Sequence, residues 1–331
     1  MGRAGWCPLA QPFARRTRPI MSNLLRKVLV AAALISAVAG SAAADGIDPP
    51  WNPPPEGGKN FTVPGVDNVP DLYGDINDPD LVVFFAGNQY MVVRELMSAF
   101  QAAYPAYQRV FVETLPPGIL ADQIEQGALV VGNLRISVKA DVYAAGRRRM
   151  QQLEQDKHWF ARMADYARNR LAIMTSLGNP RHIAGWNDLA QAGLPICMPN
   201  PKWEGIAANT IIPALRDAGG DELVNRIYRD KAEEGSTFLT RIHHRETPMR
   251  IMAGKCTAGV VWYTEAYFHA TLKQHPISLV ALPDAQNRVA IYTAGVLKDA
   301  PHRQAGEDFL AFLQSAQGQA VYAKYGFLPV Q

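Results

Sequence analysis

The sequence predicts an α/β protein with two lobes, each a parallel-dominated sheet flanked by helices, joined by two crossover strands. Three observations carry this prediction. Fully apolar strand candidates alternate with amphipathic helix candidates between residues 81 and 155, a pattern typical of parallel sheets covered by helices on both faces. A second alternating unit begins near residue 185. Two longer strand candidates, 168–177 and 288–298, connect the two units.

The first 44 residues have the order of a secretory signal. From Met21, Arg26 and Lys27 precede an apolar run of about a dozen residues, and small residues follow as far as Ala44. The run is shorter than a membrane span. We therefore expect cleavage after Ala44, upstream sequence in residues 1–20, and a mature protein exported to the periplasm.

Processing changes the charge of the chain. The precursor has 33 basic and 30 acidic residues, and the removed segment holds six basic and no acidic ones. The mature chain therefore has 27 basic residues and a formal net charge of −3. It contains no long basic run, and Arg147-Arg148-Arg149 has the character of a solvated helix start. Nucleic acid is not an expected partner.

The elements of the first lobe follow a segment of different composition. Residues 45–79 are rich in Pro, Gly and Asp and predict an extended N-terminal arm. Lobe 1 is expected to comprise 80–172 and 292–331. Its strand candidates are LVVFFAG (81–87), VFVETL (110–115) and ADVYAAG (140–146), and a helical tail closes the chain.

The second lobe is expected over 173–291. It contains the helix candidate WNDLAQAG, the strand LPICM, the loop PNPKWEG, the helix IAANTIIPALRDAG and the strand AGVVWYTEA. Cys197 lies in one of these strands and Cys256 just precedes another. In an oxidising compartment the two cysteines either form a disulfide or remain buried thiols, and the sequence leaves both open.

The order of these segments resembles a known family, the type II periplasmic solute-binding proteins of ABC importers, and within it the molybdate-binding group. The matching pieces run from about residue 81 to 328. The most specific of them are YARNRLAIMTSLGNP and the C-terminal GQAVYAKYGF. The resemblance implies a binding protein that closes over a small solute by hinge motion of the two crossover strands.

The ligand-binding positions depart from those of the resembled family. Asn88 stands where the family has a serine after the first strand, and Pro116-Pro117-Gly118 stands where it has a serine pair. The family's tyrosine position falls on Trp262. A segment GALVVGNLRISVKAD also replaces a shorter link. The resemblance therefore implies the scaffold but not the identity of the ligand.

Residues after the first two strands are candidate ligand contacts in lobe 1. Asn88 is expected to cap the following helix, either as structure alone or with neighbouring amides left for an anion. Tyr90 begins that helix and lines the expected cleft, or is a partly buried surface aromatic. The TLPPG segment either contacts ligand or forms a tight turn. The lobe 1 candidates are Asn88, Gln89, Tyr90, Thr114, Pro117 and Gly118.

Lobe 2 offers aromatic and acidic candidates. Trp203 lies in a polar loop, where exposure to the cleft is favoured over core packing. Glu204 suits a cation or a hydrogen-bonding organic ligand better than a simple oxyanion. Trp262 and Glu265 are expected at the carboxyl end of a strand, where Trp262 either walls the pocket or belongs to the core.

The stretch RIHHRETPMRI (241–251) joins two histidines to a helix-start signal. Thr247 is expected as the N-cap and Pro248 as the first helical residue, with Gly254 ending the helix. Three interpretations of the preceding segment remain open. His243, His244 and Arg245 contact a ligand; His243, His244 and Glu246 bind a metal, with Glu204 or Glu265 as further ligands; or the segment is scaffold.

Together these features favour a periplasmic solute-binding protein that captures an anion or small polar solute between its lobes and delivers it to an ABC permease in the inner membrane. We expect a monomer, no cofactor and no enzymatic activity, since the sequence has no GxSxG, HExxH, CxxC or phosphate-loop motif. The alternatives are a sensor or accessory protein for a signalling kinase or redox protein, and a metal carrier using His243 and His244.

Overall fold

The computed structural model describes residues 71–131, 134–202, 204–240 and 244–330, and all of these fall within one compact unit of the chain. The expected signal peptide (1–44) and most of the expected arm (45–70) lie outside the described residues. Among the described residues, no helix combines the length and apolarity that a membrane span requires.

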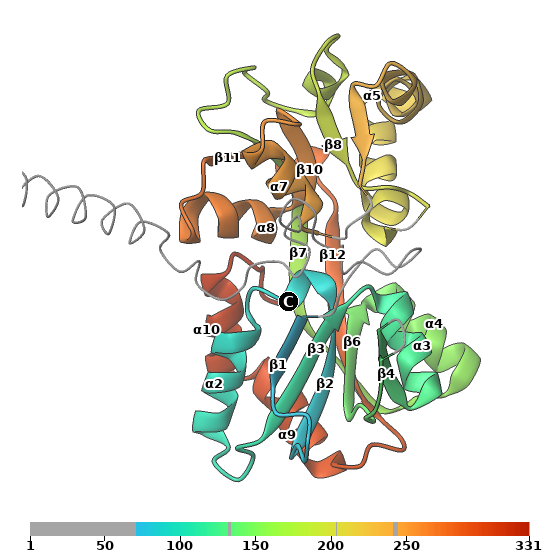
Figure 1. Ribbon diagram of the computed structural model, residues 1–331, viewed down its shortest axis with the longest axis vertical. Helices are drawn as coiled ribbons and strands as arrows, with labels where there is room; N and C mark the ends of the chain where they lie inside the picture. Colours follow the sequence, from blue (N-terminus) through green and yellow to red (C-terminus); the bar gives the residue numbers. More distant parts are fainter. Residues whose placement is uncertain (1–70, 132–133, 203, 241–243, 331) are drawn as a thin grey trace, which may run out of the picture. The chain divides into compact units, whose positions relative to one another are not determined.

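The first sheet contains six strands in the order β1-β3-β2-β6-β12-β7 (Figure 1). Their bounds are β1 Asp71–Gly74, β2 Leu81–Ala86, β3 Val110–Leu115, β6 Val142–Gly146, β7 Phe160–Ser176 and β12 Val289–Leu297. β2 pairs in parallel with β3 and β6, whereas β1 and β12 run antiparallel to their neighbours. Every residue of β2 and β3 is buried, which explains why these strands are apolar without alternation.

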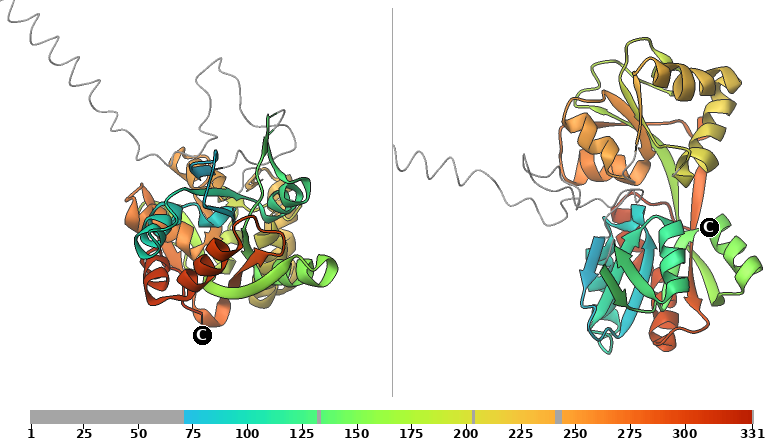
Figure 2. Two further views of the ribbon diagram at one scale, coloured as in Figure 1. Left: turned by 90° about the horizontal axis from the view of Figure 1, so that it is seen from below. Right: turned by 45° about the vertical axis from the view of Figure 1, so that its right-hand side comes forward.

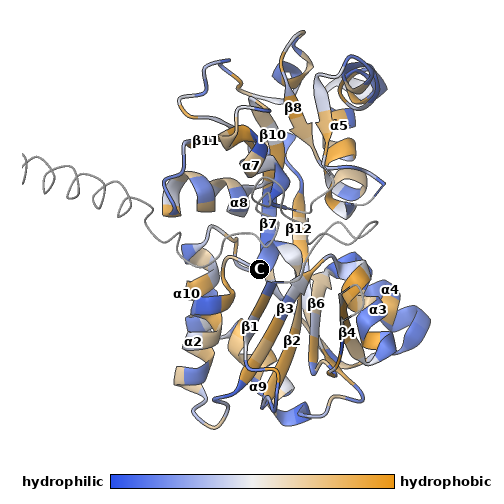
Figure 3. Ribbon diagram, viewed as in Figure 1, coloured by the Kyte–Doolittle hydropathy of each residue, from blue (hydrophilic) through white to orange (hydrophobic). Residues whose placement is uncertain are grey.

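Helices cover both faces of this sheet because alternate side chains of a strand point to opposite faces. Phe84 packs in a cluster with residues of α3 (Pro117–Gln126) and α4 (Arg147–Lys157). Phe85 instead meets Phe309 of α9 (Arg303–Gln314) edge-on. The remaining helices of this lobe are α2 Val93–Ala103 and α10 Ala316–Lys324. In Figure 3 the strands β2 and β3 are largely apolar and α4 is largely hydrophilic.

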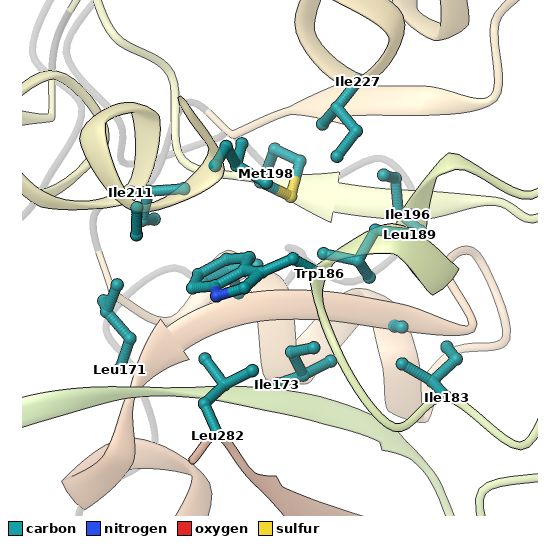
Figure 4. Packing of buried hydrophobic residues seen from close by; sticks show 14 of the residues in the cluster. Leu171, Ile173, Ile183, Trp186, Leu189, Ile196, Met198, Ile211, Ile227 and Leu282 are labelled. Carbon is teal, nitrogen blue, oxygen red and sulfur yellow. The ribbon is translucent and has the colours of Figure 1, made fainter. Parts of the chain in front are cut away.

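The second sheet has the order β9-β8-β10-β7, with β11 also paired to β7. Its new strands are β8 Ile196–Met198, β9 Thr237–Leu239, β10 Ala258–Trp262 and β11 Ile277–Ala281. Trp186 lies in the core of this lobe among Leu171, Ile173, Met198 and other aliphatic side chains (Figure 4). Its indole N–H donates to the Gln286 carbonyl at 2.8 Å, so the buried polar atom is satisfied.

Short helices surround the second sheet. They are η2 Trp186–Ala190, η3 Ala207–Ile211, α5 Ile212–Asn225, η4 Arg226–Asp230, α6 Lys231–Glu233, α7 Glu246–Met252, α8 Tyr263–Tyr267, η5 Phe268–Leu272 and η6 Asp284–Gln286. A separate apolar cluster on the sheet includes Cys197, Cys256 and Ile251. There the structure joins Cys197 and Cys256 in a disulfide, with the Cα atoms 5.9 Å apart.

β7 belongs to both sheets. Its residues Phe160 to Arg170 pair with β12, and its residues from Leu171 onward pair with β10 and β11. The strand therefore changes partners between Arg170 and Leu171. β7 and β12 run side by side where they connect the two sheets (Figure 1, Figure 2). The predicted fold class, an α/β protein of two sheets with flanking helices and crossover strands, is confirmed.

Several elements differ from the sequence prediction. The expected arm, 45–79, was wrong at its end, because Asp71–Gly74 forms the edge strand β1. Gly74 ends β1 with φ +89°, and a Cβ there would lie 1.9 Å from the Val110 carbonyl oxygen, so glycine is required at this turn. The inserted segment GALVVGNLRISVKAD forms a hairpin of β4 (Ala128–Val131) and β5 (Leu134–Ser137).

Candidate functional site

The turn after β2 carries three candidate residues into the region where the two sheets meet. Gly87–Gln89 forms the short turn η1, and α2 begins only at Val93. The expectation that Asn88 caps this helix was wrong, because the N-cap is Val92 and no side chain caps it. The Asn88 amide instead donates to the hydroxyl of Tyr292 in β12. Asn88 is 2 % exposed. Its amide therefore bonds a hydroxyl inside the protein and does not cap the helix.

Gln89 is fully buried, and neither its amide nitrogen nor its amide oxygen has a hydrogen-bond partner among the described residues. An unsatisfied buried amide costs about 1–3 kcal/mol for each missing bond. Native proteins rarely leave such groups without a role. A Gln side chain presents a donor and an acceptor, so this position is suited to a polar ligand.

Arg245 approaches the same turn from the opposite lobe. It is 4 % exposed, and its guanidinium carbon lies 3.7 Å from the centroid of the Tyr90 ring, a cation–π arrangement. Its Nη2 also bonds the carboxylate of Asp71 in β1. Arg245 thus brings a buried positive charge to residues of the first lobe.

Tyr90 is held by two further contacts with the second lobe. It precedes α2 rather than beginning it. Its hydroxyl lies 3.4 Å from His269 Nε2, and its ring meets Phe268 edge-on. Burial raises the pKa of the Tyr90 hydroxyl, although Arg245 opposes the rise. Tyr90 is therefore a neutral aromatic surface for the guanidinium.

His244 and Glu265 form a buried pair beside Arg245. His244 Nδ1 lies 2.9 Å from Glu265 Oε1, and the other carboxyl oxygen accepts from the Trp262 amide at 3.1 Å. Burial raises the pKa of Glu265 to about 8, against the opposing effects of the Trp262 hydrogen bond and Arg245. Burial, with a contribution from Arg245, lowers the pKa of His244 to about 3. At neutral pH the pair therefore adds no net charge beside Arg245.

Two expectations about the helices α7 and α8 were wrong in detail. Glu265 does not end a strand, because β10 stops at Trp262 and Glu265 caps α8. α7 begins at Glu246 rather than at Pro248. A proline is tolerated anywhere in the first helical turn because those N–H groups have no intrahelical acceptor. The expected stop at Gly254 holds, with φ +67° and its amide bonded to the Ile251 carbonyl.

The TLPPG segment divides between two environments. The Thr114 hydroxyl donates to Asp71 Oδ2 at 2.7 Å and so joins the Asp71–Arg245 group. The Pro117 carbonyl accepts instead from the Tyr143 hydroxyl at 2.9 Å. A Cβ at Gly118 would meet no atom within 4 Å. The described contacts therefore bring Thr114, but not Pro117 or Gly118, to the group formed by Asp71 and Arg245.

Glu204 and Trp262 have structural contacts. Glu204 is 3 % exposed and accepts from the Asn200 amide at 3.2 Å and from the Thr240 hydroxyl, which ties its loop to the end of β9. Trp262 is 6 % exposed and packs in the core of the second lobe, edge-on to Tyr292. Trp203 lies outside the described residues.

The metal interpretation receives no support from the described residues. His244 Nδ1 lies 2.9 Å from Glu265 Oε1, and Glu246 Oε1 bonds Arg250 Nε at 2.7 Å. Within the described ranges no group of three His, Cys, Asp or Glu side chains has metal-binding geometry. His243 lies outside these ranges.

Three residues that contact the candidate site residues were not predicted from the sequence. Asp71 lies in the Pro- and Gly-rich arm, where nothing indicated a strand. His269 lies within a helical segment, and its Nδ1 is 2.8 Å from His275 Nδ1. Tyr292 lies in a predicted crossover strand, and the expected position of that strand between the lobes was the one sequence feature that could have identified it as a site residue.

Comparison with known proteins establishes the class of protein that this fold and site represent. Residues 81–328 match the family described as bacterial extracellular solute-binding protein. The chain belongs to this family, and the resemblance to type II solute-binding proteins of ABC importers is confirmed.

Individual relatives are distant. A molybdate-binding protein of Mycobacterium tuberculosis is 23 % identical over 248 residues, which cover 75 % of this chain and 84 % of the relative. A sulfate-binding protein of Escherichia coli is 25 % identical over 53 % of this chain and 56 % of its own length. The periplasmic molybdate-binding protein of Azotobacter vinelandii has the same fold, with a TM-score of 0.60, 15 % identity, and coverage of 76 % of this chain and 100 % of that chain. These relatives favour neither the sensor nor the metal-carrier alternative.

Proposed function

We propose that this protein captures a small oxyanion between its two lobes in the periplasm and delivers it to an ABC permease in the inner membrane. Relatives named for molybdate and sulfate binding support the ligand class. In this proposal the chain is exported by cleavage after Ala44, acts as a monomer, and binds its ligand without transforming it.

The amide of Gln89, which has no hydrogen-bond partner among the described residues, carries the proposal. The residues before and after Gln89 in the sequence both contact other elements. Asn88 bonds Tyr292 of the crossover strand β12, and the Tyr90 ring stacks on the guanidinium of Arg245 in the second lobe. Along the chain, Gln89 thus lies between a residue bonded to β12 and a residue stacked on the buried Arg245. A tetrahedral oxyanion there would accept from the Gln89 amide and from the guanidinium, since charge-assisted bonds of this kind are strong.

The two lobes, 80–172 with 292–331 and 173–291, are proposed to move about β7 and β12. The change of partners in β7 between Arg170 and Leu171 supports a hinge at this point. Gln89 and Arg245 belong to different lobes, so a ligand that bonds both stabilises the closed arrangement.

Calorimetric titration and thermal unfolding with molybdate, tungstate, sulfate and phosphate test this proposal. At 100 times its dissociation constant, a ligand that binds only the folded state adds about 2.7 kcal/mol to the free energy of unfolding. Gln89→Leu, which keeps the volume but removes the amide, is expected to weaken oxyanion binding by about tenfold or more, which corresponds to one lost hydrogen bond to a charged group.

Gln123→Leu is the matched control. Gln123 is equally buried but bonds Glu113 between β3 and α3, so its replacement should leave oxyanion affinity unchanged. Absence of any stabilisation across the four anions, or equal affinities for wild type and Gln89→Leu, would contradict the proposed function.

A further inference from the structure

The carboxylate of Asp71 occupies a position that is chemically equivalent to that of a bound oxyanion. One oxygen, Oδ2, accepts from the Thr114 hydroxyl at 2.7 Å and from Nη2 of Arg245. A hydroxyl and a guanidinium are donors that commonly bind anionic oxygen in proteins. Asp71 is 174 residues distant from Arg245 in the sequence, so the fold, not local spacing, brings this carboxylate to the buried cation.

The cluster contains an ion pair between Asp71 and Arg245. Arg245 contributes one positive charge, and the buried His244–Glu265 pair beside it contributes none at neutral pH. Asp71 neutralises Arg245. An oxyanion arriving at Arg245 would therefore meet a neighbouring carboxylate, and like charges at such distances repel strongly when they are shielded from water.

The strand that carries Asp71 is weakly attached. β1 is four residues long, and among the described strands it pairs with β3 alone, at the edge of the sheet. None of its residues is buried, and Leu72 is 51 % exposed. Segments that bury little apolar surface open at low free-energy cost. The turn at Gly74 remains anchored through the Asp75 amide, which donates to the Val110 carbonyl at 3.0 Å, so β1 can detach without displacing β2.

We propose that Asp71 is a resident anion of the binding site: it occupies Arg245 and Thr114 in the unliganded protein, and the oxyanion ligand displaces it together with β1. This inference rests on the proposed function. It makes β1 an autoinhibitory strand that lowers the affinity for every anion competing for Arg245, and it restricts the ligand to a group able to replace a carboxylate.

The variant Asp71→Asn tests whether the charge of Asp71 competes with the ligand, because it leaves the size of the side chain unchanged. Asparagine keeps the size of the side chain and can still accept from Thr114, but it removes the negative charge. Titration of the full-length mature protein with molybdate and with sulfate should show affinity about tenfold or more higher in Asp71→Asn than in wild type for the anion that binds. Asp75→Asn is the matched control. Asp75 is exposed on the same segment and bonds Asn77, so its replacement should leave affinity unchanged.

Hydrogen exchange provides a second measurement on the wild-type protein. Saturation with the bound anion should accelerate exchange of the backbone amides of Asp71–Gly74 if the ligand displaces β1. Slower exchange on binding, or an Asp71→Asn affinity equal to or below that of wild type, would overturn the resident-anion proposal while leaving the proposed function intact. If neither wild type nor Asp71→Asn binds molybdate, tungstate, sulfate or phosphate, the proposed function fails and this inference fails with it.

Discussion

At the scale of single residues, Glu113 shows how burial controls ionisation in this protein. It lies on β3 with no exposed surface, and among the described residues it accepts one hydrogen bond, from the Gln123 amide at 3.1 Å. Burial raises its pKa from the ordinary value of 4.5 to about 8, although the Gln123 bond opposes the rise. The folded protein therefore favours the protonated, neutral form of the Glu113 carboxyl group.

This pKa predicts the direction of a pH dependence. Because the folded pKa lies above the unfolded one, the contribution of Glu113 to stability is complete below about pH 4.5 and is lost as the pH rises through about 8. Glu113→Gln should remove this loss, so the variant should exceed wild type in free energy of unfolding at pH 8–9 by a few kcal/mol, at about 1.4 kcal/mol per pKa unit.

Urea denaturation at pH 5 and pH 9 measures this effect. Glu222→Gln is the control, because Glu222 is exposed on α5 and its replacement should alter stability little at either pH. A Glu113→Gln variant whose stability relative to wild type is the same at both pH values would show that folding does not raise the pKa of Glu113.

The sequence indicated the positions of several site residues but not their partners. Asn88, Gln89 and Tyr90 were candidates because they follow an apolar strand, and Arg245 was a candidate because it precedes a helix start. The role of Asn88 was nevertheless wrong, since helix-cap preference describes local bonding and Tyr292 is 204 residues away in the sequence. Asp71 could not be found, because no local pattern places a four-residue edge strand beside Arg245.

At the scale of elements, the disulfide joins two segments of the second lobe. Cys197 of β8 and Cys256 before β10 are separated by 59 residues, and β8 pairs in parallel with β10. The sequence placed Cys197 in one strand candidate and Cys256 just before another but left their pairing open, because the order and register of strands follow from packing that local patterns do not encode.

Removing this disulfide should destabilise the protein. A cross-link closing a loop of this length is expected to contribute about 2–4 kcal/mol by restricting the unfolded chain. The variant carrying both Cys197→Ala and Cys256→Ala should show a correspondingly lower free energy of unfolding in guanidinium chloride. Reductant should destabilise wild type and leave the double variant unchanged. Free thiols in the oxidised wild-type protein, or equal sensitivity of both proteins to reductant, would argue against the bond.

At the scale of the whole described unit, alternation of apolar strands and amphipathic helices was sufficient to predict the class of fold. The two long strand candidates likewise indicated the crossover strands, although β7 begins eight residues earlier than predicted, at Phe160. The short strands β1, β9 and β11 were missed, because three to five residues carry too little periodicity for recognition. What the sequence did not provide was the set of contacts between lobes, such as Arg245 with Tyr90 and Asp71.

The proposed function depends on binding of a small oxyanion by Gln89 and Arg245. The most direct test is an anomalous difference map from crystals of the protein grown with tungstate, whose metal gives a strong anomalous signal. We expect a single strong peak whose ligand oxygens lie at hydrogen-bond distance, about 3 Å, from the Gln89 amide and the Arg245 guanidinium. A tungstate peak elsewhere on the protein, with none in contact with Gln89 and Arg245, would contradict it.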